Sequence, residues 1–231
     1  MNTPTNPHIE EVRSEFDQGW LDMYLAASEG TPAWGEDAPP FIDNILPHIR
    51  SGSDVLELCC GDGRATKKFV EHGAIVIGLD VSADAIHQLD GNFHAQKLKP
   101  PMTVIGSATK IPLGDEKFDA VICINGICQI DRPRLTMEEA ARVLRPGGIF
   151  IFDVFTPLDQ TFGAGEKIGP GSFLYKGCLF AFYTAEQFAD VFKDKFRVKE
   201  MTESAWDDPP HGSFRPQPHR HHALIYVLEK I

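Results

Sequence analysis

Between about residues 53 and 155 the chain alternates short apolar segments with helical segments, and this alternation is its strongest constraint on the fold. The apolar segments DVLELCC, AIVIGLD, MTVIG, FDAVICI and IFIFDVF have the length and composition of buried strands. Helical patterning occurs in GRATKKFVEHG, in SADAIHQLDGNF with Ser82 as its N-cap, and in RLTMEEAARVLRPGG. Strands and helices in this order predict an α/β fold with a parallel sheet covered on both faces.

The regions on either side of this core have a different character. Residues 8 to about 28 place apolar side chains at helical spacing, and a second short helix is predicted at about 40–50. We therefore expect an N-terminal helical cap over residues 1–52, followed by one α/β domain over residues 53–231. At about 156–183 the sequence is irregular and rich in glycine and aromatic residues. An insert this long typically forms a lid or a substrate loop.

The C-terminal part predicts one more helix and two more strands. TAEQFADVFKDK is helical with Thr184 as its cap, FRVKEMTES reads as a sixth strand, and ALIYVLEK reads as a seventh. A loop rich in proline and histidine, WDDPPHGSFRPQPHRHH, separates the two strands. Because no helix lies between them, we predict an antiparallel hairpin at one edge of the sheet.

Composition narrows the class of protein and its partners. The net charge of -11 disfavours nucleic acid as a partner, because such binding normally needs a basic surface. No apolar run reaches the roughly 18 residues that span a bilayer, and the N-terminus has no secretory signal pattern. The five cysteines include an adjacent pair but no CxxC pair. We therefore expect a cytoplasmic protein that binds neither nucleic acid nor membrane and holds no metal.

The residues at the ends of the first two strands favour a cofactor that contains adenosine. Gly61 and Gly63 follow the first strand and permit a close approach of the backbone to a ligand. Asp80 ends the second strand, where a carboxylate can bind a ribose diol. The dinucleotide pattern G-x-G-x-x-G is not met. The carboxylates Glu57, Asp62 and Asp80 suit a cationic ligand better than a pyrophosphate.

The segment VLELCCGDGRATKKF resembles the first motif of the class I S-adenosylmethionine-dependent methyltransferases. GLDVSADAI, GSATKIPLGDEKFDAVICING and LRPGGIFIFDVF resemble further motifs of that family in the expected order, so the resemblance covers about residues 53–155. It implies a Rossmann-like three-layer sandwich whose mostly parallel seven-stranded sheet has an antiparallel last strand. Residues 53–231 would then be a methyltransferase domain with a lid-like insert.

The resemblance also implies the cofactor, S-adenosyl-L-methionine, with S-adenosyl-L-homocysteine as product. The residues that it places at this cofactor are Glu57, Cys59, Gly61, Gly63, Asp80, Val81, Ser107, Ala108, Asn125 and Gly126. Two of them depart from the family pattern. Cys59 stands where the family has its first glycine, and Ser107 stands where it often has an acid.

The acceptor is expected to be a small molecule that is methylated on oxygen, nitrogen or sulfur. The protein is expected to be a monomer or a homodimer. Methyltransferases that act on nucleic-acid bases carry an acid or asparagine, two prolines and an aromatic after the fourth strand, whereas this chain reads NGIC there. Two other hypotheses about the function remain open. One is a nicotinamide-dependent oxidoreductase on a Rossmann sheet, and the other is a protein that binds S-adenosylmethionine without catalysis.

The hairpin loop and the aromatic residues supply candidates for the acceptor side. His219, His221 and His222 are predicted to act in catalysis, because a hairpin loop would overhang the cofactor. Structural hydrogen bonding or a bound metal are the alternatives, although no acid lies at ligand spacing in the sequence. An aromatic substrate pocket is predicted from Trp20, Tyr24, Trp34, Tyr175 and Trp206, with ordinary core packing as its alternative.

Overall fold

A computed structural model describes residues 17–26, 34 and 37–231. Its main sheet has seven strands in the order β3-β2-β1-β4-β5-β10-β9. The strands are β1 (Asp54–Leu58), β2 (Ile75–Asp80), β3 (Met102–Ile105), β4 (Phe118–Cys123), β5 (Leu144–Phe155), β9 (Phe196–Asp208) and β10 (His219–Lys230). Strands β1 to β5 pair in parallel, and β10 is antiparallel to both of its neighbours. The predicted α/β fold with an antiparallel last strand is confirmed.

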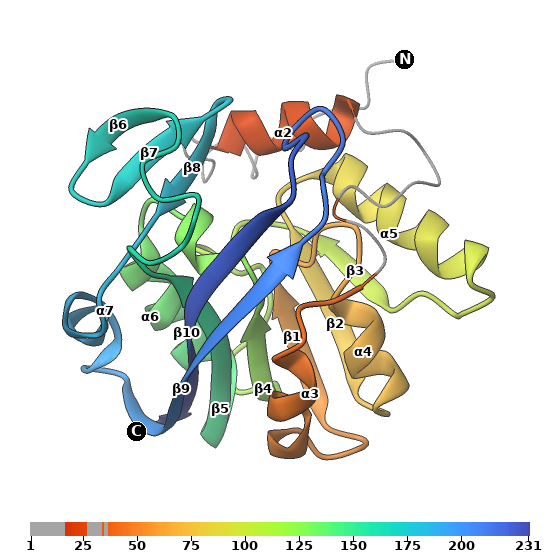
Figure 1. The fold of residues 1–231 in the computed structure, drawn as a ribbon. Coiled ribbons are helices and arrows are strands. Elements are labelled where there is room, and N and C mark those ends of the chain that lie inside the picture. Colours follow the sequence, from red (N-terminus) through yellow and green to blue (C-terminus); the bar gives the residue numbers. More distant parts are fainter. Residues whose placement is uncertain (1–16, 27–33, 35–36) are drawn as a thin grey trace.

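Helices cover both faces of this sheet (Figure 1). They are α3 (Ile42–Ile45), α4 (Thr66–Glu71), α5 (Ala83–Ala95), α6 (Pro133–Val143) and α7 (Ala185–Phe192), with short 3-10 turns at Leu46–His48 and Ile127–Gln129. The side chain of Ser82 caps α5 as predicted, and Thr184 caps α7 in a capping box with Gln187. The helix predicted at about 40–50 is shorter than expected, because it tightens into a 3-10 turn at Pro47.

The insert after β5 is more regular than its sequence indicates. Residues 166–181 form a second sheet of three antiparallel strands, β6 (Glu166–Gly169), β7 (Ser172–Tyr175) and β8 (Cys178–Ala181). Gly171 and Gly177 adopt positive φ angles of 68° and 81° in the turns between these strands. The expectation of an irregular segment was wrong, because strands of four residues are too short to show an alternating pattern.

The hairpin of β9 and β10 is longer than predicted. Asp208 pairs with His219, and Trp206 pairs with His221, so both ends of the expected loop are strand. Only residues 209–218 connect the two strands. Placing His219, His221 and His222 in a loop was therefore wrong. Proline, aspartate and histidine are not typical strand residues, so the sequence did not indicate the ends of β9 and β10. The backbone groups of these ends are nevertheless satisfied, because the two strands hydrogen-bond to each other.

Helix α2 (Asp17–Ala26) lies over the insert and beside the turn of the hairpin (Figure 1). Gly19 of α2 faces the backbone of Gly177 so closely that a methyl group would not fit between them. Trp20 packs against Phe180 of the insert and Phe214 of the hairpin. The rest of the helix predicted at residues 8–28 lies outside the described residues. In the part of the chain that is described, no helix is long and apolar enough to cross a membrane.

Candidate active site

A cavity lies where the carboxyl ends of the parallel strands meet α2, the insert and the hairpin. Eight of the ten predicted cofactor residues line it: Glu57, Cys59, Gly61, Asp80, Val81, Ser107, Ala108 and Asn125. The other two lie behind the wall. Gly63 faces Leu89 and Phe93 of α5, and Gly126 faces the side chains of Cys59 and Cys123. These two glycines support the loops rather than the cavity surface.

The turn after β1 is held in a left-handed conformation. Cys59 and Gly61 have φ angles of 55° and 54°, a region that favours glycine. The carboxylate of Asp80 accepts 2.9 Å hydrogen bonds from the backbone amides of Gly61 and Ser82. A methyl group at Gly61 would meet the hydroxyl of Tyr24 on α2. Tyr24 therefore covers the backbone of Gly61 directly beneath the N-terminal helix.

The carboxyl groups at this end of the cavity are buried with few partners. Burial raises the pKa of Glu57 to about 8, against the neighbouring Thr66 hydroxyl, which lowers it, and Oε2 of Glu57 has no hydrogen-bond partner among the described residues. Burial also raises the pKa of Asp80 to about 6, against the hydrogen bonds from Ser82 and Gly61 that lower it. A buried carboxyl group whose charged form lacks a partner fits a cationic ligand, because the cation would restore the charged form.

Asn125 is positioned by an aspartate that the sequence analysis did not single out. The backbone amide of Asn125 donates a 2.6 Å hydrogen bond to Asp153 Oδ1, across the ends of β4 and β5. Burial raises the pKa of Asp153 to about 7. Asn125 adopts a φ of 54°, and its side-chain Oδ1 has no partner among the residues described. The loop after β4 thus presents an amide oxygen at the cavity.

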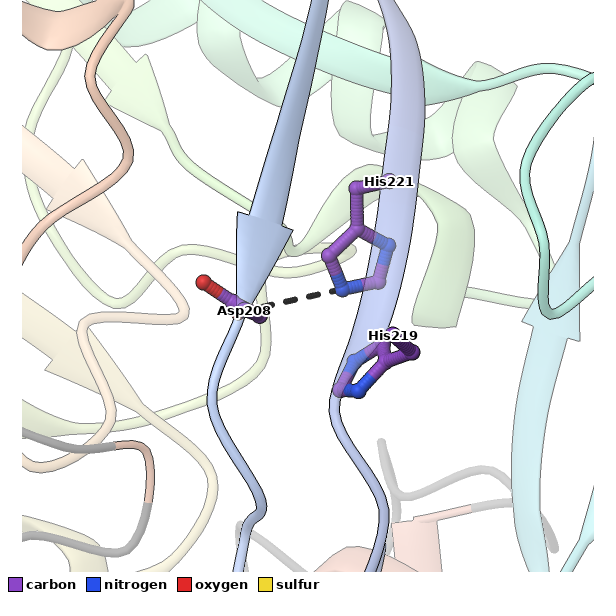
Figure 2. Close-up of side chains that lie close together, drawn as sticks. All are labelled: Asp208, His219 and His221. Carbon is purple, nitrogen blue, oxygen red and sulfur yellow. Dashed lines mark ion pairs between the residues drawn. The ribbon is translucent and has the colours of Figure 1, made fainter.

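His219 and His221 line the hairpin end of the cavity together with Asp208. Figure 2 shows the side chains of His221 and Asp208 directed toward each other from adjacent strands, with His219 next along β10. His221 Nε2 lies 3.8 Å from Asp208 Oδ2. Burial, with smaller effects from His221 and Arg215, lowers the pKa of His219 to about 4, so its neutral ring is a weak proton acceptor.

His222 is absent from the cavity lining. Its side chain lies on the opposite face of the sheet from that of His221. There Nδ1 lies 2.8 Å from Thr156 Oγ1, and Nε2 lies 3.8 Å from Glu203. The prediction that His222 acts in catalysis was wrong, because successive residues of a strand face opposite sides.

Several charged residues of this site were missed by the sequence analysis. Arg64 donates hydrogen bonds of 3.2 and 2.8 Å to the two oxygens of Asp208, and His211 Nε2 lies 3.3 Å from Asp208 Oδ2. Asp159 Oδ2 lies 2.8 Å from His221 Nδ1. The pairing of β9 with β10 would have revealed Asp208, but no local pattern marks Arg64 or Asp159.

Arg215 is a buried cation at the hairpin end of the cavity, with only 9% of its surface exposed. Its guanidinium carbon lies 4.9 Å from the ring centre of Tyr175 and 4.8 Å from that of Phe180. Within the described residues its side chain makes neither a hydrogen bond nor a salt bridge. Burial lowers the pKa of Arg215 below its ordinary value. A guanidinium held between two rings with free donors fits an anionic ligand.

The predicted aromatic pocket is found only in part. Trp20, Tyr24 and Trp34 line the cavity, and Trp34 Nε1 donates a 2.8 Å hydrogen bond to the Tyr24 hydroxyl. Tyr175 instead donates a 3.1 Å hydrogen bond to the Phe214 carbonyl, and Trp206 packs against Phe41 and Phe155. Neither of these two side chains lines the cavity. Placing them in the pocket was wrong, because a sequence does not show which face of a strand lies toward the cavity.

Residues 56–152, which contain the turn after β1, Asp80 and the loop after β4, match the family model described as a methyltransferase domain. This part of the chain is therefore similar to a methyltransferase domain. The order β3-β2-β1-β4-β5-β10-β9 and the cavity at the strand ends are the framework that carries it.

Two curated methyltransferases are similar in sequence. An uncharacterized methyltransferase of Synechocystis is 35% identical over 129 residues, which cover 54% of this chain and 58% of that protein. Demethylmenaquinone methyltransferase of Mycobacterium tuberculosis is 31% identical over 120 residues, which cover 52% and 48%. The chain therefore spans about half the length of the curated relatives that it matches.

Two solved structures show the same fold at low sequence identity. A protein from a study of thioacetal formation from a disulfide bond in echinomycin biosynthesis has a TM-score of 0.74 at 18% identity, covering 94% of this chain and 92% of that chain. The 1,6-didemethyltoxoflavin-N1-methyltransferase of Burkholderia thailandensis, solved with S-adenosylhomocysteine, has a TM-score of 0.65 at 19% identity and covers 100% and 93%.

Proposed function

We propose that this chain transfers a methyl group from S-adenosylmethionine to oxygen, nitrogen or sulfur of a small molecule. The observation that carries the proposal is the buried carboxyl of Glu57, whose Oε2 has no partner among the described residues, beside the left-handed turn at Gly61 in the cavity wall. A cofactor with a cationic amino group and a sulfonium would supply the positive charge that this end lacks. When bound, S-adenosylmethionine supplies an electrophilic methyl group.

The residues at the strand ends fit the parts of this cofactor. Glu57 would bind the amino group of its methionine portion, and Asp80 would accept hydrogen bonds from the ribose hydroxyls through lone pairs not used by Gly61 and Ser82. Val81, Ser107 and Ala108 would flank the adenine. Ser107 stands where the family often has an acid. Its hydroxyl lies 2.8 Å from Thr109 Oγ1, so it is hydrogen-bonded within its own turn.

Glu57 and Asp80 lie at the end of the cavity formed by β1 and β2, whereas Arg64, Asp208 and Arg215 lie at the end formed by the hairpin. Arg64 is paired with Asp208. Because Arg215 has no such partner among the described residues, it is the group available to an acceptor. We infer that the acceptor carries a negatively charged group, such as a carboxylate. The rings of Trp20, Trp34 and Phe180 would exclude water around it.

Calorimetric titration with S-adenosylhomocysteine and with NADH tests the cofactor. We expect binding of S-adenosylhomocysteine at a Kd of about 1 to 100 μM, which corresponds to about 5 to 8 kcal/mol. If NADH bound and S-adenosylhomocysteine did not, the proposal would be refuted, and a nicotinamide-dependent oxidoreductase would be favoured instead.

Transfer of a radiolabelled methyl group to small aromatic and aliphatic acids, each compared with its neutral amide, tests the reaction. Labelling of an acid but not of its amide is expected. Cofactor binding with no transfer to any compound of such a library would favour a protein that binds the cofactor without methylation.

A further inference from the structure

Asp208, His219 and His221 form a compact set of potential metal ligands at the hairpin end of the cavity. One oxygen and two ring nitrogens, one from each residue, all lie within 4.8 Å of one another, and all three residues are buried. Asp208 is paired directly with His219 across the two strands, and His221 is two residues further along β10. Residues with this relationship face the same side of a sheet, as Figure 2 shows.

The second nitrogen of each histidine ring is held from behind. His221 Nδ1 lies 2.8 Å from Asp159 Oδ2, and His219 Nδ1 lies 3.3 Å from the backbone carbonyl of Gln217. Asp159 is fixed in turn by Thr161, whose amide and hydroxyl donate hydrogen bonds of 2.8 and 2.6 Å. A carboxylate or carbonyl behind the ring is the usual arrangement for a histidine that binds a metal through its other nitrogen.

His219 provides a second observation that points to a ligand. Its Nε2 is buried and has no hydrogen-bond partner in the part of the chain that is described, and only 8% of the residue is exposed. A buried polar atom without a partner is costly to folding, typically by about 1–3 kcal/mol. The residue lines the cavity, so a ligand that enters there would satisfy this atom.

The contacts of Asp208 leave room for another partner. Arg64 and His211 take up some of its lone pairs, but two carboxylate oxygens offer about four acceptor positions. A network of ion pairs alone accounts for Asp208, Arg64 and His211. It does not account for Nε2 of His219, which has no partner among the described residues.

We propose that Asp208, His219 and His221 bind a divalent transition-metal ion with open coordination positions that face the cavity. Two imidazoles and one carboxylate suit zinc, iron, cobalt or manganese, whereas calcium and magnesium favour oxygen ligands alone. Sequence spacing offered no acid to these histidines, and the pairing of β9 with β10 supplies one.

The role of the metal rests on the proposed methyl transfer. The ion would bind a hydroxyl or thiol of the acceptor and lower its pKa. The O–H or S–H bond then breaks, the proton leaves to bulk water, and the electron pair stays on the oxygen or sulfur. This would supply a nucleophile without a protein base.

The protein is freed of metal with a chelator and titrated calorimetrically with ZnCl2, MnCl2 and MgCl2. We expect one equivalent of zinc to bind with a Kd of 10 μM or tighter, and magnesium to bind at least 100-fold more weakly. His219→Ala and His221→Ala are expected to weaken zinc binding at least 100-fold. His222→Ala is the matched control, because this neighbour on β10 contacts Thr156 outside the cavity and is expected to leave zinc binding unchanged.

Affinity for S-adenosylhomocysteine, measured on the same preparations, reports whether each variant is folded and keeps the two proposals apart. His219→Gln is used if His219→Ala does not fold. Absence of zinc binding, zinc binding no tighter than magnesium, or an equal loss in His222→Ala would overturn the metal site. If S-adenosylhomocysteine then still binds, the methyltransferase proposal stands. If zinc bound but S-adenosylhomocysteine did not, the metal site would be supported and the proposed methyl transfer would be refuted.

Discussion

The carboxylate of Asp80 accepts a 2.9 Å hydrogen bond from the backbone amide of Gly61 and so ties the end of β2 to the turn after β1. The same carboxylate binds the amide of Ser82 at the start of α5. Three elements that surround the proposed ribose site therefore share one side chain. A change in this carboxyl group is expected to affect both the shape of the turn and the binding of the cofactor.

Asp80→Asn is expected to weaken binding of S-adenosylhomocysteine by about 10- to 100-fold, because a hydrogen bond to a charged group contributes about 1.5–3 kcal/mol. Isothermal titration calorimetry measures this directly. Asp84→Asn, which changes an exposed carboxylate in the first turn of α5, should leave the affinity unchanged. Equal affinities of the wild type and Asp80→Asn would remove Asp80 from the ribose site.

Glu57 is expected to make the stability of the cofactor-free protein decrease with rising pH. Its pKa of about 8 in the fold lies above the ordinary 4.5, so the folded state keeps a proton that the unfolded state has lost. The free energy of unfolding then falls between about pH 4.5 and 8, by up to about 1.4 kcal/mol per pH unit. Asp80 and Asp153 add to this slope only up to about pH 6 and 7.

Urea denaturation of the wild type and of Glu57→Gln between pH 6.5 and 8 measures that contribution. The slope of the variant is expected to be shallower, because glutamine does not titrate. Glu71→Gln, at an exposed position on α4, is the control and should keep the wild-type slope. Parallel slopes for the wild type and Glu57→Gln would show that Glu57 does not hold its proton in the fold.

Cys59 is expected to tolerate glycine but not valine. A side chain at a φ of 55° costs about 1–2 kcal/mol, which glycine avoids. Glycine also loses the packing of the Cys59 side chain against Gly126, so we expect the free energy of unfolding to stay within about 1 kcal/mol of the wild type. Cys59→Val should lose about 2 kcal/mol or more, because a branched residue is disfavoured in this conformation.

Chemical denaturation of both variants tests this, with Cys59→Ala as the control that removes only the thiol. A loss of several kcal/mol in both Cys59→Gly and Cys59→Ala would show that packing of the sulfur outweighs the strain of the backbone.

Gly19→Ala is expected to displace α2 from the insert, because its methyl group would collide with the backbone of Gly177. Tyr24 on the same helix covers Gly61, so affinity for S-adenosylhomocysteine should fall and α2 should be cleaved faster in limited proteolysis. Gly91→Ala is the control, since no atom lies within 4 Å of its added carbon, and it should raise stability by about 0.5–1 kcal/mol. If Gly19→Ala changed neither the affinity for S-adenosylhomocysteine nor the rate at which α2 is cleaved, the packing of α2 against Gly177 would not matter for cofactor binding.

Arg215→Met is expected to raise the free energy of unfolding by about 1 kcal/mol, because methionine can fill the space between Tyr175 and Phe180 without a buried, unpaired charge. Methylation of acidic acceptors should fall at least tenfold, while affinity for S-adenosylhomocysteine should not change. Urea denaturation and the radiolabel assay measure the two effects. Methylation of acids at the wild-type rate would exclude Arg215 as the site of the anionic group.

The cofactor side of the cavity could be predicted from the sequence, whereas most of the acceptor side could not. Glu57, Gly61 and Asp80 directly follow apolar strands, and the carboxyl ends of parallel strands meet at one edge. Local order along the chain therefore fixes which of these residues come together. Ser82 and Thr184 were recognised as caps for the same reason, because capping depends on the next few residues only.

The residues of the hairpin depend on the register between two distant strands. Whether His221 or His222 faces the cavity is decided by the pairing of His219 with Asp208, and a shift of one residue would exchange them. Arg64 and Asp159 reach this cluster from separate loops, so no spacing in the sequence connects them with it. The pairs become visible only when the strands are in place.

The side chains that shape the acceptor end, such as Trp20, Phe180, Arg215 and His219, all lie outside residues 56–152, the stretch that matches the methyltransferase domain. Mutations in these outer segments would therefore alter which compound the proposed enzyme methylates without disturbing the turn proposed to hold the cofactor. Divergence within such a family would proceed by exchange of its outer segments over a constant sheet. Engineering of new acceptors in this chain would begin with α2, the insert and the hairpin.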